Sequence, residues 1–175
     1  MIIDKYKFIH LGAGDLLRAE IKRGTEQGKK IKEIIDTGSI VPVKITCGLI
    51  KQEMEKQGKD KIYLIDGYPR NQDNIDGWKE IFGDTYKLIC TINLEAPEEE
   101  LTKRLIERSK NSGRSDDNIE VIKKRFKTHR ECSAPIIPEV KKMGPYIEVY
   151  AMNDKITVFN NIVIELDKKI KEAGI

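Results

Sequence analysis

Short runs of apolar residues alternate along this chain with longer segments of helical periodicity. The run at 62–65 predicts a strand that is buried on both faces, as the strands of a parallel sheet are. Runs at 8–11, 88–94 and 146–150 predict three further strands, of which 88–94 is also of the buried type. Because helical segments separate these runs, the sequence predicts an α/β fold in three layers, with a parallel sheet flanked by helices. At this length we expect residues 1–175 to form a single domain.

Capping residues and prolines predict where several helices begin and end. Residues 12–14 predict a tight turn, and Asp15 is expected to cap the helix that follows. Asp154 is expected to cap the last helix in the same way. Other helices are predicted at about 27–36, 45–58, 71–82 and 97–108, and from 118 to a break around Pro135 and Pro138. The apolar face of the last helix is predicted to comprise Ile156, Phe159, Val163, Leu166 and Ile170.

The composition excludes several classes of protein. Lys+Arg 32 against Asp+Glu 29 leaves a net charge of +3, which is too balanced for the dense basic face of a nucleic-acid-binding protein. Cys47, Cys90 and Cys132 are far apart and form no CxxC pair, so we expect reduced cysteines rather than a disulfide or zinc framework. No apolar run has membrane-spanning length, and the first residues lack a signal-peptide pattern. We therefore expect a cytoplasmic protein, with the nucleus as an alternative, and no nucleic-acid or membrane partner.

Polar residues follow the predicted strand at 62–65, where ligands bind in open α/β sheets. Asp66 can orient a metal-bound water, and Gly67 allows a ligand to approach the backbone. Arg70 offers a planar fork of donors that suits a phosphate group. This strand end is therefore a candidate phosphate site, although an ordinary strand exit with a surface arginine is the alternative.

Arginines from separate elements strengthen the candidate site. The polar segment at 109–118 is predicted to be a surface flap. The arginines fall at strand ends, at the edge of this flap, or on the helices that bound the flap. Such a set can hold several phosphates and spread the charge of a transferring phosphoryl group. In a chain with so many charges, scattered surface residues are the alternative. The five are Arg18, Arg70, Arg108, Arg114 and Arg125.

Three motifs carry a resemblance to a known family. HLGAGDLLR at 10–18, IDGYPRNQDN at 65–74 and GRSDDN at 113–118 occur in this order. In these motifs the chain resembles the adenylate kinase superfamily of nucleoside monophosphate kinases, and within it the UMP/CMP kinases. The resemblance implies a phosphate-loop kinase fold, with an acceptor-binding helical insert at about 15–58 and a short lid at about 108–118. It also implies a monomer that transfers the γ-phosphoryl of ATP, with Mg²⁺, to UMP or CMP.

The resemblance implies roles for residues that match the family motifs. Arg18 and Arg70 would bind the acceptor phosphate, and Asp66 would place Mg²⁺ through water. Asn74 would read the base, and together with Ala13 it indicates a pyrimidine, because adenylate kinases carry glutamine at the place of Asn74. The other implied residues are Ser39, Ile40, Val41 and Gly67 around the acceptor, Arg104 and Arg108 on the ATP side, Arg114 and Arg125 at the transferring phosphoryl, and Asp116 and Asp117 in the flap.

The chain departs from the family at several places. Gly12 and Ser39 stand where the family has serine and lysine, which could weaken binding. More important, a phosphate loop of the form GxxxxGK[ST] occurs nowhere in the 175 residues. We therefore expect a kinase truncated at the N-terminus, without the family's central first strand, with two unpaired strand edges and impaired phosphoryl transfer. A non-catalytic nucleotide-binding remnant and an adenylate kinase that acts on AMP are the alternatives.

Overall fold

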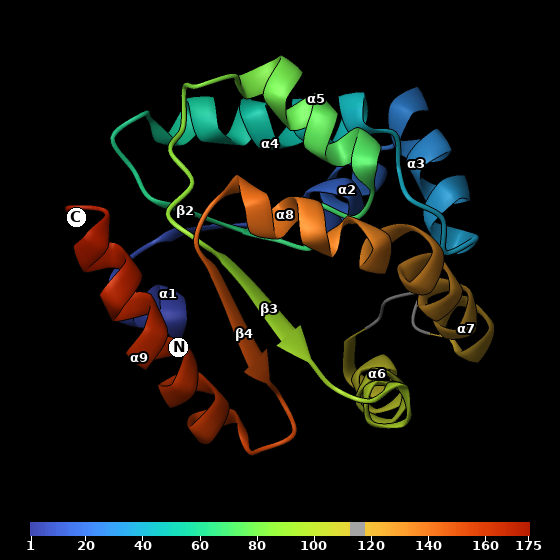
Figure 1. Ribbon diagram of the computed structural model, residues 1–175. Helices are drawn as coiled ribbons and strands as arrows, with labels where there is room; N and C mark the ends of the chain where they lie inside the picture. The colour runs from blue at the N-terminus through green and yellow to red at the C-terminus, as the bar shows by residue number, and fades with distance from the viewer. Residues whose placement is uncertain (113–117) are drawn as a thin grey trace.

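The computed structural model describes residues 1–112 and 118–175 (Figure 1). The strands are β1 (Ile9–Gly12), β2 (Tyr63–Asp66), β3 (Thr91–Glu95) and β4 (Tyr146–Tyr150). The α-helices are α1 (Ile2–Tyr6), α2 (Ala13–Lys22), α3 (Glu26–Asp36), α4 (Val43–Gln57), α5 (Gln72–Phe82), α6 (Glu98–Ser112), α7 (Ile119–Thr128), α8 (Ile137–Met143) and α9 (Lys155–Glu172). A π-helix, η1 (His129–Ser133), and a 3₁₀ helix, η2 (Ala134–Ile136), join α7 to α8.

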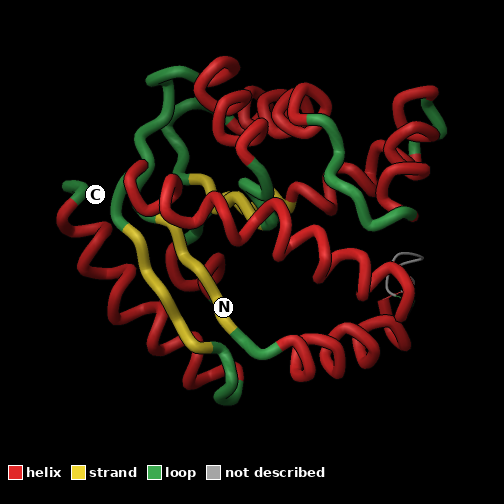
Figure 2. Tube along the Cα trace, turned by 45° about the vertical axis from the view of Figure 1, so that its right-hand side comes forward, coloured by secondary structure: helices red, strands yellow, loops and turns green. Residues whose placement is uncertain are grey.

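The four strands form two separate parallel pairs. β1 pairs with β2, with Ile9 opposite Tyr63, and β3 pairs with β4, with Thr91 opposite Tyr146. In the described part of the chain no ladder joins the two pairs. Figure 2 shows the pairs as two separate groups of yellow tubes at an angle to each other. The predicted α/β class with parallel strands is therefore confirmed. The two pairs do not join into one continuous sheet.

Helices cover both sides of the strands, which gives the predicted three layers (Figure 1). On one side α4 and α5 pack on β1 and β2 around a buried cluster that includes Leu11, Cys47, Ile50, Met54 and Phe82. On the other side α9 and α1 pack around a second cluster, formed by Phe8, Ile147, Val149, Ile162 and Leu166. No helix in the described residues has the length and apolar character that a membrane span requires.

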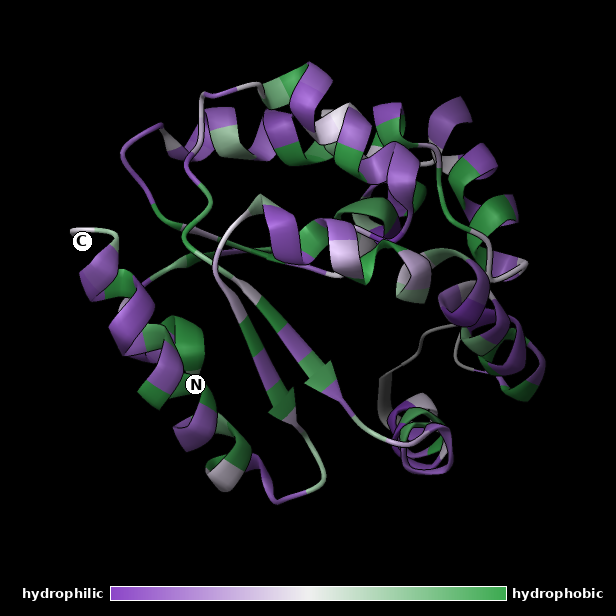
Figure 3. Ribbon diagram, viewed as in Figure 1, coloured by the Kyte–Doolittle hydropathy of each residue, from purple (hydrophilic) through white to green (hydrophobic). Residues whose placement is uncertain are grey.

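The strands are less buried than their apolar sequences predict. Tyr63, Leu64 and Ile65 are half-buried, and Leu94 is 54% exposed. Figure 3 shows hydrophobic and hydrophilic residues alternating along β3 and β4, a pattern typical of strands with only one face in the core. The prediction of strands buried on both faces is therefore wrong. Among the described residues β2 and β3 each pair along one edge only, and such edge strands are less enclosed than the central strands of a parallel sheet.

The start of α2 differs from the predicted turn and cap. The helix begins at Ala13 directly after β1, and Gly12 with extended dihedral angles occupies the N-cap position. Asp15 lies in the first turn, and its carboxylate accepts a hydrogen bond from Arg18 at 2.6 Å. The carboxylate remains favourable there because helix N-termini attract negative charge. The cap predicted at Asp154 is confirmed, because its carboxylate accepts from the amides of Ile156 and Thr157 at 2.9 and 3.1 Å.

The prolines change the helix type without breaking the helical path. Pro135 and Pro138 lie in the first turns of η2 and α8, where a missing N–H costs no intrahelical hydrogen bond. At the predicted break the chain therefore stays helical, and it changes from the α-helix α7 through the π-helix η1 and the 3₁₀ helix η2 to the α-helix α8. The predicted flap also differs, because α6 continues through 109–112. Residues 113–117 of the flap lie outside the described residues.

The buried face of α9 differs in part from the predicted one. Ile162 and Leu166 are buried, and Val158 and Ile170 pack beside them in the same cluster, which makes a row with a spacing of four. Ile156 is 64% exposed, so its predicted place in the core is wrong. The sequence of α9 has apolar residues at adjacent positions, so helical spacing alone allows two rows. Packing against β4 selects one of them.

We expect the substitution Gly77→Ala to destabilise the fold, since a Cβ at Gly77 would lie 2.3 Å from Cγ2 of Val43 where α5 crosses α4. An overlap of this kind costs about 1–3 kcal/mol of unfolding free energy. Gly48→Ala in α4 is the matched control, because no atom lies within 4 Å of its Cβ position. There alanine should stabilise by about 0.5–1 kcal/mol. Urea unfolding of both variants tests this, and a Gly77→Ala protein as stable as the parent would contradict the close packing.

Candidate active site

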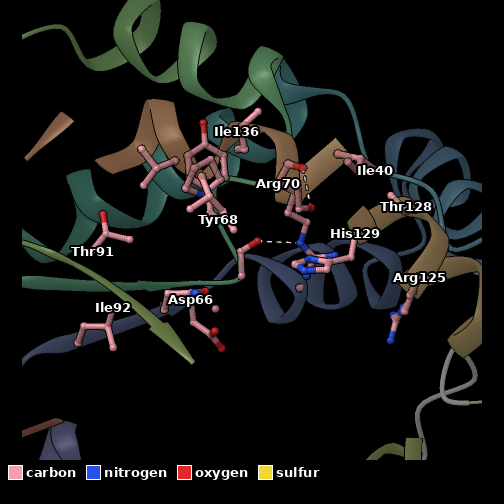
Figure 4. A pocket seen from close by; sticks show the side chains of 18 of the residues that line it. Ile40, Asp66, Tyr68, Arg70, Thr91, Ile92, Arg125, Thr128, His129 and Ile136 are labelled. Atoms are coloured by element: carbon pink, nitrogen blue, oxygen red, sulfur yellow. Dashed lines mark hydrogen bonds between the residues drawn. The ribbon is translucent and has the colours of Figure 1, made fainter. Parts of the chain in front are cut away.

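A cavity of about 550 Å³ opens at the carboxyl ends of β1 and β2 and beside the first residues of β3, Thr91–Asn93 (Figure 4). Helix α2 follows β1 into its wall, and the loop at 66–70 follows β2. Helices α6, α7 and η1 close it from the other side. Its polar and charged lining residues include Asp15, Arg18, Asp66, Arg70, Asn93, Arg108, Arg125, Thr128, His129 and Ser133. Four arginines from four separate segments thus share one hollow.

Hydrogen bonds within the described residues hold both the backbone and the side chain of Arg70. The Arg70 amide donates to Oδ1 of Asn74 at 3.0 Å, and Oγ of Ser133 donates to the Arg70 carbonyl at 2.8 Å. The Arg70 Nε donates to the carbonyl of Gly67 at 2.8 Å. Gly67 has φ +76°, and Nη2 of Arg70 lies 3.1 Å from its Cβ position, so a side chain at 67 would strain the backbone and crowd the guanidinium. The loop therefore holds Arg70 in one orientation.

All eight residues predicted to bind the acceptor line a smaller hollow of about 60 Å³ beside the cavity. Arg18, Arg70 and Arg125 line both hollows, so they lie at the junction between them. A ligand could place an anionic group at this junction and a ring in the smaller hollow. The eight residues are Ala13, Arg18, Ser39, Ile40, Val41, Gly67, Arg70 and Asn74.

Asn74 is only 3% exposed and lies in the first turn of α5. Its amide donates to Oδ1 of the capping residue Asn71 at 3.0 Å, while its own Oδ1 accepts from the Arg70 amide. Asn74 therefore links the start of α5 to the arginine loop. Since Oδ1 already accepts a bond, its side-chain NH₂ group is the part that can donate to a ligand.

Tyr68 is a residue of the site that the sequence reasoning missed. It lines both hollows, its hydroxyl donates to the carbonyl of Asn74, and Sγ of Cys47 lies 3.0 Å from the hydroxyl oxygen. Burial raises the pKa of the Tyr68 hydroxyl above its ordinary value, with the hydrogen bond to Cys47 as a smaller cause. Tyr68 therefore acts as a neutral donor that ties α4 and α5 together. Its signal in the sequence is an aromatic residue inside the strand-end loop.

Asp66 is the more exposed of two carboxylates in the cavity lining, since Asp15 is bonded to Arg18. Its side chain is 71% exposed, and its Oδ2 lies 3.7 Å from Nε2 of His10. Among the described residues no group of three or more His, Cys, Asp or Glu side chains could hold a metal ion. One carboxylate fits Mg²⁺ held mainly by waters and by the phosphates of a nucleotide, which is how Mg²⁺ commonly binds in phosphoryl-transfer sites.

The residues predicted on the ATP side and at the transferring phosphoryl fall into three groups. Arg108 and Arg125 line the cavity. Arg104 lines neither hollow, and its Nε donates to Oε1 of Glu100 at 2.8 Å. Arg114, like Asp116 and Asp117, lies outside the described residues. Arg104 is therefore the predicted residue that the described structure does not bring to the site.

The fold and site define an α/β protein with an arginine-lined cavity at the carboxyl ends of β1 and β2. The sequence model of the family described as "Adenylate kinase" matches residues 1–144. UMP-CMP kinase 3 of Arabidopsis thaliana is 41% identical over 161 residues, which cover 92% of this chain and 77% of that protein. UMP-CMP kinase of Mus musculus is 39% identical over 173 residues, 96% of this chain and 88% of that protein. Adenylate kinase 1 of Schistosoma mansoni is 38% identical over 169 residues, 95% and 84% of the two chains.

The chain therefore belongs to the adenylate kinase family, as a nucleoside monophosphate kinase of the UMP/CMP kinase-like type. The family is one of phosphotransferases, whose substrates are nucleotides. The arginines that meet at the junction of the two hollows suit such substrates, because guanidinium groups bind phosphates through paired hydrogen bonds.

Proposed function

We propose that this chain binds a pyrimidine nucleoside monophosphate, UMP or CMP, as the acceptor of the γ-phosphoryl of ATP. The observation that carries the proposal is the single hollow lined by all eight acceptor residues and joined to the arginine cavity. The relatives named UMP-CMP kinase support the same choice of acceptor. We further propose a cytoplasmic monomer.

In this proposal the acceptor lies across the junction of the two hollows. Arg18 and Arg70 bind its phosphate, and the base lies in the smaller hollow beside Asn74. Arg108 and Arg125 face the transferring phosphoryl from the opposite wall and spread its charge, a role also proposed for Arg114. Asp66 would hold Mg²⁺ through water, and the bound ion would supply positive charge at the phosphate oxygens.

A second candidate function is nucleotide binding without catalysis. It is favoured by one observation, the absence of a GxxxxGK[ST] loop from the 175 residues. In phosphate-loop kinases that loop cradles the donor phosphates with backbone N–H groups and a lysine. The two candidates share the acceptor site, so acceptor binding alone does not separate them.

CMP and UMP are expected to raise the melting temperature of the protein more than AMP does. The reason is that Asn74 and Ala13 shape the base hollow for a small ring. At a CMP concentration 100-fold above its dissociation constant, binding should add about 2.7 kcal/mol, which is on the order of 5–10 °C for a chain of this size. Thermal unfolding with CMP, UMP and AMP measures this.

Cytidine without its phosphate is the control, and it should stabilise far less because it cannot engage Arg18 and Arg70. Stronger stabilisation by AMP than by CMP would refute the pyrimidine assignment and favour an adenylate kinase. No stabilisation by any monophosphate would refute the acceptor site itself.

A further inference from the structure

His129 lies in the cavity wall and has no role in the proposed function so far. It is the first residue of the π-helix η1, its side chain is exposed, and it lines the larger hollow. Figure 4 shows its imidazole beside the side chain of Arg70, at the same opening. Within the described residues no hydrogen bond or ion pair engages this imidazole. Its N–H groups are thus available to a ligand.

His129 lies in a π-helical turn that lines the cavity. π-Helical turns are rare, occur mostly as single turns and are frequent at functional sites. Both His129 and Ser133 of this turn line the hollow, and Ser133 is bonded to the Arg70 carbonyl at 2.8 Å. The preceding helix α7 adds Arg125 and Thr128 to the same wall. His129 is therefore on an element that is tied directly to the phosphate-binding loop.

The charged groups around His129 favour an anion. They come from α2, from β2 and the loop after it, from α6 and from α7, and the arginines outnumber the carboxylates by four to two. Imidazole donates a hydrogen bond in its neutral form and carries a positive charge when protonated, a change that ordinary imidazoles make between pH 5 and 8. The six charged groups that line the cavity with His129 are Asp15, Arg18, Asp66, Arg70, Arg108 and Arg125.

We propose that His129 is a further phosphate-binding residue, whose imidazole donates a hydrogen bond to the phosphate held by Arg18 and Arg70. The inference rests on the proposed function, because the anion is the phosphate of a bound nucleotide. Since the protonated imidazole adds a positive charge to this hydrogen bond, anion binding favours the protonated form of His129. Affinity for an anion of constant charge therefore rises as the pH falls.

Sulfate is the probe, because it keeps two negative charges from pH 5.5 to 8, whereas a nucleoside monophosphate changes charge in this range. We expect the parent protein to bind sulfate about 10-fold more tightly at pH 5.5 than at pH 8, the size of one charge-assisted hydrogen bond. His129→Gln should bind it with less than about a twofold change. Isothermal calorimetry at the two pH values measures both.

The chain offers a matched control, because it contains only two histidines. His10→Gln, on β1 outside the cavity lining, should retain the pH dependence of the parent. In NMR spectra the two variants assign the two imidazole signals, and the midpoint of the His129 titration should rise when sulfate is added while that of His10 stays unchanged. A residue with a purely structural role would not show this shift.

The outcomes separate this inference from the proposed function. If the parent binds CMP and sulfate but His129→Gln retains the pH dependence, His129 is not a phosphate ligand and the acceptor site stands. If His10→Gln removes the dependence instead, the inference is likewise overturned. If the parent binds neither CMP nor sulfate, the proposed function fails and the inference fails with it.

Discussion

Replacing Arg70 with alanine is expected to weaken CMP binding by about 100-fold or more, because removing one partner of a desolvated charge pair costs about 2–5 kcal/mol. The effect should be large because the structure already holds this arginine in place. Its amide, carbonyl and Nε are each engaged, by Asn74, Ser133 and Gly67 respectively. The ligand therefore meets an oriented guanidinium and loses little entropy in ordering it. Calorimetric titration of CMP into the variant measures the loss.

Two further substitutions sharpen this experiment. Arg130→Ala is the matched control, because Arg130 is exposed, bonds Glu98 and lines neither hollow. Its affinity for CMP should equal that of the parent. Arg70→Lys keeps the charge but loses the planar fork, so it should fall between the parent and alanine. If Arg70→Ala binds CMP as tightly as the parent does, Arg70 is not part of the acceptor site.

The 175-residue chain is expected to show no appreciable transfer of phosphoryl from ATP to CMP. The four arginines that line the cavity can neutralise charge on the transferring group. The backbone N–H groups and the lysine of a phosphate loop, which hold the donor phosphates in this family, have no counterpart in the sequence. Loss of one major charge-stabilising part of such a site costs on the order of 10³–10⁵ in rate. A coupled assay for ADP release in the presence of CMP, ATP and Mg²⁺ measures turnover.

CMP binding by the same preparation is the necessary control, since it shows that the acceptor site is folded. Binding without turnover would support the non-catalytic candidate. Steady turnover that disappears in Arg70→Ala would contradict our expectation and show that other groups hold the donor phosphates. Turnover that persists in Arg70→Ala would indicate a contaminating kinase.

The separation of the two strand pairs bears on both experiments. β2 ends at Asp66 and β3 carries Thr91–Asn93, and both segments line the same cavity without pairing. The wall from β3 to α8 is partly apolar, with Ile92, Ile136 and Val140. It offers no cation to a phosphate, so the arginine side of the cavity is the part suited to anions. The acceptor site is therefore the better-formed half of the proposed active site.

Much of the fold was predictable because the local signals are strong. The strand at 146–150 matches β4, and the helix start at Asp154 is confirmed by its two capping hydrogen bonds. Five of the predicted acceptor residues lie in two of the motifs, Ser39, Ile40 and Val41 follow from the family resemblance, and all eight line one hollow. Their roles in binding stay predictions.

Other features could not be predicted from local patterns. Asp15 looks like a cap, but β1 continues directly into α2, so Gly12 takes the cap position and Asp15 pairs with Arg18. Helical spacing in α9 allows two apolar rows, and only the contacts with β4 show that Ile162 and Leu166 are buried while Ile156 is exposed. In both cases tertiary neighbours decide between alternatives that are locally equal.

By itself, the sequence determined the α/β class and the order of the four strands, because both depend on periodicity, and the resemblance carried by its motifs supplied the predicted acceptor residues. Only the tertiary structure decided that the strands form two pairs with half-buried faces, since pairing depends on neighbours distant in sequence. It also placed Tyr68, His129 and Ser133 in the site. No local pattern marks His129 and Ser133, because their place in the cavity wall depends on how η1 lies against the Arg70 loop, which Ser133 contacts.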